Sequence, residues 1–429
     1  MSVLGPISTM QAARPATYLD LDFSNGDTPG NLVYSRASGH GVWDKDGKYS
    51  VVGPNVPPIT WVPELNSYAL ALEPGDRLRN VLNPNDSGWL RRTLGYDIAP
   101  ATDIPAIQES AVFVDAPDGS MTALRVNGKR TAGQGPVISF QTSTTYARAK
   151  FFIRKGLGLG ERVVPIFFRN STTATNFPIV TLDLGSGELG TIPDTSNQYF
   201  RVTRRCRDWL EVDAVRGGFS PGDVVAFYIH GSSARDIRAD YWRLNLSSNP
   251  VISSFIQPGI SYTERAAYSG ITPIVMPTEA GAQFDWFVEG VIDAHPWAIP
   301  NGVIPWGIRN VGGGNRVDVI WSTSASHSIR HADAQGLSRT FVSANDVALS
   351  KGGRRFVRCT ARSANNRAYG SPSGANVLSL ETYADMANAP ALAGHAIGAY
   401  GKENGAAYLK RSAIFPAGTL DDLKTASMR

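Results

Sequence analysis

Hydrophobic and polar residues alternate in short runs along most of this chain. Tyr146-Ala-Arg-Ala-Lys-Phe-Phe-Ile153 and Trp209-Leu-Glu-Val-Asp-Ala-Val215 are clear examples, and clusters of Gly, Pro, Asn and Ser separate such runs. Alternation with a period of two predicts β-strands, because successive side chains of a strand point to opposite faces. No helical pattern of comparable strength interrupts the runs, which favours a β-sandwich or barrel over a βαβ enzyme fold.

The first region rich in such runs covers about residues 79–268. It contains eight predicted strands: 122–126, 146–153, 163–168, 179–184, 200–203, 209–215, 224–229 and 241–246. Eight short strands joined by turns are typical of a sandwich.

The second β region covers about residues 269–429. Its predicted strands are 286–292, 316–321, 340–342, 354–360, 376–380, 395–398 and 407–415. One short helix is expected at 419–426, with Thr419 as its N-cap. The sequence therefore predicts a second sandwich after the first.

Residues 1–78 form a different kind of segment, punctuated by Gly and Pro. Tyr18–Phe23 predicts a strand, and Asp44-Lys-Asp-Gly47 predicts a tight turn between Val42-Trp43 and Tyr49–Val52. So few apolar residues cannot bury a core of their own. We expect this leader to lie on something else and to act as a docking segment.

Composition agrees with an all-β chain of two or three domains. Of 429 residues, only 18% are charged, and 43 Gly and 27 Pro provide many turns. The net charge of +4 is a mild surplus at this length, so we expect no nucleic-acid partner. The two cysteines, Cys206 and Cys359, fall in different predicted domains, which disfavours a disulfide-stapled fold. We find no secretory signal pattern and no apolar run of about 18 residues, and we expect synthesis in a cytoplasm and no membrane insertion.

Three acidic residues in the second region first suggest a glycosidase. Asp285, Glu289 and Asp293 would share one face of a strand at 284–293. Successive members would lie about 13 Å apart at the rise of a strand, whereas glycosidase carboxyls lie about 5–9.5 Å apart. We therefore interpret them as a solvated face and predict no catalytic residue.

Candidate metal ligands are equally weak. His327 and His331 have the spacing of a helical pair, but their surroundings resemble a loop or strand, which would separate the two rings. Oxygen ligands for Ca²⁺ could come from a set of neighbouring polar residues, but these have no EF-hand spacing: Asn310, Asn315, Asp318 and Asp333. We predict no metal and no cofactor.

The glycines of Gly156-Leu-Gly-Leu-Gly160 superficially resemble a dinucleotide-binding loop. A second predicted strand, rather than a helix, follows them. We interpret the segment as a hairpin connection.

The best candidate for recognition is the aromatic loop His295–Trp306. Prolines flank Trp297 and Trp306, which could make flat platforms for sugar rings or anchor a neighbouring subunit. The alternative is that both rings fold over their own sandwich.

Several motifs occur in an order that resembles one protein family. In the leader they are Tyr34-Ser-Arg-Ala-Ser38, Trp43-Asp-Lys-Asp-Gly47, Leu72-Glu-Pro74, Arg79-Asn-Val-Leu82 and Trp89. Further along they are Tyr146–Arg154, Tyr241-Trp242, Ser261–Ala267 and the Gly-rich strand Tyr408–Phe415. Together they resemble virion proteins of tailed bacteriophages, such as head fibres, capsid decorations and tail appendages. The leader departs from the usual pattern in reading Ala71-Leu-Glu-Pro-Gly-Asp-Arg77, and Glu264 precedes Arg265 in the closing signature.

The resemblance implies two concanavalin A-like jelly-roll sandwiches in tandem. The first, 79–268, would resemble a carbohydrate-binding module, and the second, 269–429, a laminin-G-like domain. It also implies a non-enzymatic structural protein of the virion, docked through the leader on other virion proteins and assembled as a homo-oligomer, with a trimer as the guess by analogy. Two alternatives stay open: a carbohydrate-binding protein that recognises a glycan on the host surface, and a glycan depolymerase.

Overall fold

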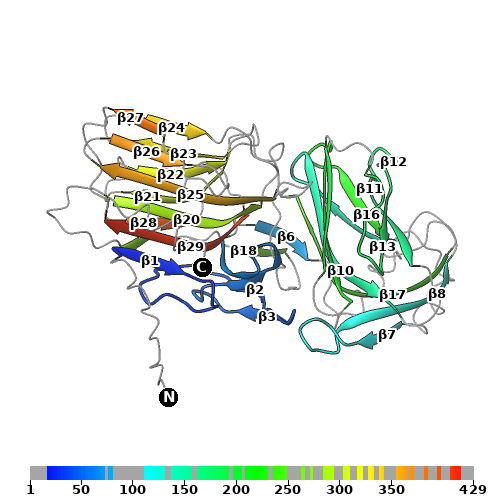
Figure 1. Ribbon diagram of the computed structural model, residues 1–429. Helices are drawn as coiled ribbons and strands as arrows, with labels where there is room; N and C mark the ends of the chain where they lie inside the picture. Colours follow the sequence, from blue (N-terminus) through cyan, green and yellow to red (C-terminus); the bar gives the residue numbers. More distant parts are fainter. Residues whose placement is uncertain are drawn as a thin grey trace, which may run out of the picture.

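The chain is an all-β protein in the computed structural model, and the sheets of its described part are all antiparallel (Figure 1). The structure describes residues 17–72, 76–80, 111–130, 137–156, 162–192, 197–204, 208–229, 235–248, 262–265, 271–273, 284–293, 303–309, 316–321, 327–332, 338–342, 354–364, 367–371, 381–384, 394–397 and 406–416. The expected fold class is thereby confirmed. Among these residues no helix is long and apolar enough to cross a membrane.

Two sheets make the first sandwich, on the right in Figure 1. We call one the β10 sheet, with the order β14-β15-β10-β17-β6-β18 and with β8 and β7 beside β17. Its strands are β6 (Asp76–Asn80), β7 (Ala111–Val114), β8 (Ala123–Arg130), β10 (Tyr146–Lys155), β14 (Gln198–Arg204), β15 (Leu210–Gly217), β17 (Arg235–Ser247) and β18 (Tyr262–Arg265). The other, the β11 sheet, has the order β12-β11-β16-β9 with β13 beside β11. Its strands are β9 (Val137–Gln141), β11 (Val163–Asn170), β12 (Thr175–Asn176), β13 (Val180–Asp183) and β16 (Val224–Ile229).

The core of the first sandwich follows directly from the alternating pattern. Phe151 and Ile153 of β10 face Phe168 of β11 and Phe227 of β16, and all four are at most 1% exposed. Each such side chain contributes roughly 1.5–3 kcal/mol when it leaves water. The period of two therefore fixes which face of each sheet turns inward.

The second sandwich also has two sheets. The β20 sheet has the order β27-β26-β25-β20-β29-β5-β4, and β1 also pairs with β29. Its strands are β1 (Leu19–Asp22), β4 (Ile59–Val62), β5 (Ser67–Leu72), β20 (Phe284–Asp293), β25 (Arg354–Ala364), β26 (Arg367–Ser371), β27 (Glu381–Ala384) and β29 (Ala406–Pro416). The β22 sheet has the order β19-β28-β21-β22-β23-β24, with β19 (Ile271–Pro273), β21 (Val303–Arg309), β22 (Arg316–Trp321), β23 (His327–Ala332), β24 (Ser338–Val342) and β28 (Gly394–Ile397).

Three strands of the leader belong to this second sandwich. The first, β1, pairs with one end of β29, where Leu19 lies opposite Ile414, and β5 pairs with the other end, where Leu72 lies opposite Ala407. Leu19 and Leu72 are both 2% exposed and belong to the core between the two sheets. These three leader strands are therefore an integral part of the second sandwich.

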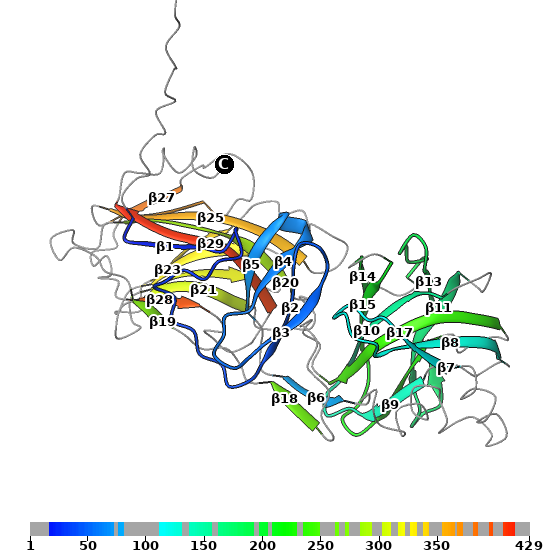
Figure 2. The ribbon, with the colours of Figure 1, turned by 90° about the horizontal axis from the view of Figure 1, so that it is seen from below.

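The predicted leader hairpin is confirmed as β2 (His40–Trp43) and β3 (Tyr49–Val52). The carboxylate of Asp44 accepts hydrogen bonds from the amides of Asp46 and Lys48. Gly47 has a φ of 78°, which glycine adopts without strain. Figure 2 shows β2 and β3 of this hairpin between the two sandwiches.

The remaining sequence predictions fare unevenly. Every strand predicted in the first region is present. The hairpin interpretation of Gly156–Gly160 is wrong, because β10 and β11 on either side of this segment lie in different sheets, and residues 157–161 themselves lie outside the described part. Since both strands need an inward apolar face, alternation alone could not tell a hairpin from a crossover. The strand predicted at 376–380 and the helix predicted at 419–426 lie outside the described residues.

Candidate functional site: the outer face of the β10 sheet

The β10 sheet buries polar side chains on the face opposite its core. Arg148 and Lys150 alternate with the core residues of β10, and Glu211 and Asp213 do the same on β15. All four are between 1% and 3% exposed. Charged residues are seldom buried this deeply without partners, so the face is the main candidate for a specific role.

Strand register places four polar residues opposite one another on this face. Arg201 of β14 pairs with Asp213 of β15, Asp213 with Lys150 of β10, and Lys150 with Asn245 of β17. We call these four residues the polar row. The Arg201 guanidinium lies 2.9 Å from the Asp213 carboxylate, and the Lys150 ammonium lies 3.5 Å from that carboxylate and also contacts Glu211.

Among the buried atoms of the polar row that make no hydrogen bond are the side-chain nitrogen of Asn245 and one carboxylate oxygen of Asp213. A buried polar atom without a partner costs roughly 1–3 kcal/mol. The row therefore retains a hydrogen-bond donor and an acceptor that a water molecule or a ligand hydroxyl could use.

A second group of charges lies further along the same face. The carboxylate of Asp240 accepts two hydrogen bonds from Arg125, at 2.7 and 2.9 Å, and one from Arg154 at 2.7 Å. Burial alone would lower the pKa of Arg154, but its hydrogen bonds to Asp115 and Asp240 outweigh burial and raise that pKa above its ordinary value. The hydrogen bond to Asp240 likewise raises the pKa of Arg125. Both guanidinium groups are therefore permanent cations that hold β8, β10 and β17 together.

Aromatic side chains occupy the space between these two groups. Phe152 and Trp242 lie opposite each other on β10 and β17, with ring centroids 4.9 Å apart. Trp43 and Tyr49 of the leader hairpin pack on them, and all four belong to one buried cluster. The outer face of the β10 sheet is thus the place where the leader contacts the first sandwich.

The two buried carboxylates of β15 are both bound to cations. Glu211 and Asp213 share the ammonium of Lys150, and Asp213 is also paired with Arg201. A glycosidase needs one protonated carboxylic acid beside one carboxylate that is free to act as nucleophile or base. In the structure both carboxylates of β15 are instead paired with cations.

Of the two sequence-predicted recognition residues, the structure describes Trp306, which does not lie on this face. Trp306 lies in β21 and is 0% exposed in the core of the second sandwich, so its predicted place on a recognition loop is wrong. Gly290 of β20 makes room for the ring, because a Cβ atom there would lie 2.9 Å from it. Trp297 lies outside the described residues.

The acidic residues of β20 also differ from their interpretation as a solvated face. Asp285 is 0% and Glu289 is 5% exposed. The carboxylate of Glu289 accepts hydrogen bonds from Arg358 at 3.0 Å and from Lys410 at 3.3 Å. The side chain of Asp293 is not among those described. Pairing of β20 on both edges, by β25 and β29, explains why cations from neighbouring strands surround Glu289.

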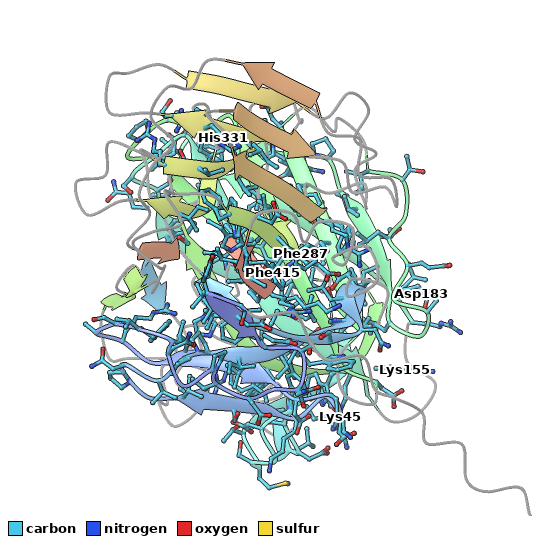
Figure 3. All side chains as sticks on the ribbon, turned by 60° about the vertical axis from the view of Figure 1, so that its left-hand side comes forward. Lys45, Lys155, Asp183, Phe287, His331 and Phe415 are labelled. Carbon is cyan, nitrogen blue, oxygen red and sulfur yellow. The ribbon has the colours of Figure 1, made fainter. Side chains whose placement is uncertain are left out.

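Between these two carboxylates the β20 sheet carries an apolar contact on the same face. Phe287 of β20 and Phe415 of β29 lie side by side there (Figure 3), and they form a small buried cluster with Ala413. No acidic pair that faces solvent remains in the described part of this strand.

The candidate metal residues that the structure describes are not brought together. His327 and His331 lie at the two ends of β23, and their spacing in a strand separates them by roughly 13 Å. Asp318 is 1% exposed and is bound by Arg316 and Arg330. In the described part of the chain, no group of three or more His, Cys, Asp or Glu side chains could hold a metal ion. Asn310, Asn315 and Asp333 lie outside that part.

Sequence reasoning missed the aromatic contact between leader and sandwich. It singled out Trp43 in the hairpin motif and Trp242 near the end of the first β region, but it had no means of pairing them. About 200 residues separate the two, and only strand register brings them to one face.

Comparison of the chain with models of known protein families found no match, and comparison with curated proteins found none either. Function therefore has to be argued from the residues and the fold.

Proposed function

We propose that this chain is a non-enzymatic structural component of a tailed-bacteriophage virion, of the capsid-decoration, head-fibre or tail-appendage type. The observation that carries the proposal is the ordered set of leader motifs from Tyr34 to Trp89 and their resemblance to leaders of such proteins. Synthesis would take place in the host cytoplasm, and the mature location would be the virion.

The places of two motif residues support a structural role. Arg36, in the centre of the Tyr34–Ser38 motif, is 2% exposed. Trp43, which opens the hairpin motif, is 7% exposed and packs on the first sandwich. Motif residues that are buried in this way would serve the assembly of the chain itself and not contact with a substrate.

The sandwiches themselves support the expected type of domain. Each has two antiparallel sheets over an apolar core, as concanavalin A-like jelly rolls have. We propose that the first corresponds to a carbohydrate-binding-module-like domain and the second to a laminin-G-like domain. In this proposal the likeness concerns shape, and sugar binding is a separate property.

A structural role also agrees with the state of the buried carboxylates. Glu211, Asp213, Asp240 and Glu289 are each paired with at least one cation. Such pairs favour a stiff module over an acid–base site.

Assembly would involve copies of the same chain and other virion proteins. We propose a closed homotrimer, since symmetric appendages present several copies at one attachment point. Any weak contact between a sandwich and a host glycan would be strengthened by that copy number.

Immunogold electron microscopy of particles from the phage that encodes this chain tests the proposal. Antibodies against the purified full-length chain should label intact particles at fixed positions, and light scattering of the chain should give three times the monomer mass. Particles without label, with all of the chain in the soluble fraction of the lysate, would overturn the virion role.

Incubation of the wild-type chain with host polysaccharide tests the enzymatic alternative. Our proposal expects no new reducing ends. If reducing ends appear and are lost in Glu211→Gln or Glu289→Gln, the chain is a depolymerase.

A further inference from the structure

The leader hairpin is held by both sandwiches. On one side, the amide of Trp43 donates to the hydroxyl of Thr60 on β4, at 2.9 Å, and the amide of Lys45 donates to the hydroxyl of Tyr68 on β5, at 3.2 Å. Both strands belong to the β20 sheet of the second sandwich. The hairpin is therefore fixed to that sandwich through its backbone.

On its other side the hairpin lies against the first sandwich. The ring of Trp43 lies 5.3 Å from that of Phe152, and the ring of Tyr49 lies 5.3 Å from that of Trp242, both in edge-to-face geometry. The amide of Tyr49 donates to the carbonyl of Pro117 at 3.1 Å. Edge-to-face aromatic pairs are favourable beyond the area that they bury.

A bulge in β17 adds a cation to this contact. The register between β10 and β17 shifts after Phe151, and Arg243 is the extra residue, between Trp242 and Leu244. Its guanidinium lies 4.8 Å from the ring centroid of Tyr49 and 4.3 Å from that of Trp242. β-Bulges commonly redirect one side chain in this way.

The backbone of Arg243 is strained. Its φ is 45°, in the left-handed region that favours glycine, and a side chain there costs free energy. Glycine would form the same bulge without that cost. The bulge therefore does not explain why this residue is an arginine. The contact of its side chain with Tyr49 of the leader does.

The guanidinium of Arg243 also approaches a carboxylate. It lies 3.5 Å from the carboxylate of Asp118, in the turn that also receives the Tyr49 amide through Pro117. Arg243 thus contacts the leader ring, the β17 ring and the turn that receives the hairpin.

We propose that Arg243 is a latch, which locks the leader hairpin onto the first sandwich and thereby couples the two sandwiches mechanically. The aromatic rings supply the apolar contact, and the bulge aims a cation across it. With the latch closed, the two sandwiches move and unfold as one unit.

The variant Arg243→Gly tests this, because it relieves the strain while removing the cation. The matched control is Ala174→Gly, since Ala174 also has a positive φ, of 55°, on an exposed turn away from the hairpin. If Arg243 only shapes the bulge, both variants should be slightly more stable than wild type and should unfold like it.

The latch predicts a different result for Arg243→Gly alone. Hydrogen exchange at the Tyr49 amide should become at least about tenfold faster, and calorimetry should resolve two unfolding transitions in place of one. Small-angle scattering of the full chain should show a larger radius of gyration. Arg243→Lys, which keeps a cation, should lie between the two, and Tyr49→Leu should reproduce the two transitions.

Results for Arg243→Gly that match those for Ala174→Gly would overturn the proposal. Global misfolding of Arg243→Gly would be recognised by loss of the wild-type circular dichroism spectrum. In that case hydrogen exchange at the Tyr49 amide of Arg243→Lys decides. If Arg243 is a latch, this exchange is faster than in wild type, and if Arg243 only shapes the bulge, it is unchanged.

Discussion

The two sandwiches carry the same charge pattern on their outer faces but bury it to different depths. In the β20 sheet, register aligns Asp22, Arg411, Glu289 and Arg358 on β1, β29, β20 and β25. In the β10 sheet it aligns the polar row, Arg201, Asp213, Lys150 and Asn245. Charges of opposite sign alternate across neighbouring strands in both sets, and the polar row ends in the neutral Asn245.

Exposure separates the two sets. The side chains of Lys150 and Asp213 are 4% and 1% exposed, whereas those of Arg358 and Arg411 are 24% and 19% exposed. Partly exposed ion pairs add little to the stability of the fold, because water and salt screen their charges. Forming a buried ion pair costs free energy, because both charges lose their water. Removing one partner costs more, because the other charge then stays buried with neither water nor a counter-ion. The same cross-strand pattern should therefore be a minor feature in one sheet and a strict requirement in the other.

The largest difference in lost stability is expected between two substitutions of lysine by methionine. Lys150→Met should lower the free energy of unfolding by about 3–5 kcal/mol, because Glu211 and Asp213 then keep buried charges without their shared cation. Lys410→Met should lower it by less than about 1 kcal/mol, since Lys410 is 25% exposed and Glu289 keeps Arg358. Urea unfolding of both variants measures the contrast, and equal losses would show that depth of burial does not separate the two faces.

A smaller difference in lost stability is expected when two aspartates, each of which binds an arginine through both carboxylate oxygens, are replaced by asparagine. Asp240→Asn should lose about 2–3 kcal/mol of stability, because Arg125 and Arg154 both donate to a carboxylate that is 0% exposed. Asp20→Asn should lose about 1 kcal/mol, since its side chain is 22% exposed and Arg411 retains a contact with Asp22.

Salt makes this second comparison sharper. In thermal unfolding at low and high salt, the loss caused by Asp20→Asn should shrink as salt rises, and the loss caused by Asp240→Asn should persist. Two losses that shrink alike would contradict the assigned difference in burial.

The smallest effect is expected at the exposed pair of Arg162 and Asp183 in the first sandwich. The hydrogen bond from Arg162, followed by the one from the Ser186 amide, lowers the pKa of Asp183. The pair therefore adds stability above the ordinary aspartate pKa, and this is lost as the pH falls through the lowered native pKa. Asp183→Asn should cost no more than about 0.5 kcal/mol at neutral pH, and the variant and wild type should become equally stable in strong acid. A gap that widens in acid would contradict the direction of the pKa shift.

The strands were largely predictable from the sequence, because each depends on local alternation. The runs around Phe151 and Val212 show a period of two, the run around Phe227 is continuously apolar, and all three are strands with those residues in the core. The leader hairpin was predictable for a similar local reason, since Asp44 and Gly47 suit a tight turn.

The outer faces could not be predicted in the same way. Alternation assigns Glu289, Asp213 and Lys150 to the side away from the core, and a sheet with one free face would leave them in water. Their burial depends on what covers that face, and sequence spacing contains no such information. Trp306 shows the converse, because its prolines suggested a loop although the ring lies in the core.

The sequence by itself determined that this chain is all-β, where most strands lie and which side of each faces inward, because those properties depend on neighbours one or two residues away. Only the tertiary structure decided that the leader completes the second sandwich, that its hairpin meets Trp242 and Arg243, and which charges are buried. Those contacts join residues up to about 400 positions apart, such as Asp20 and Arg411. They depend on which strands pair and in which register, and an alternating pattern is compatible with many such pairings.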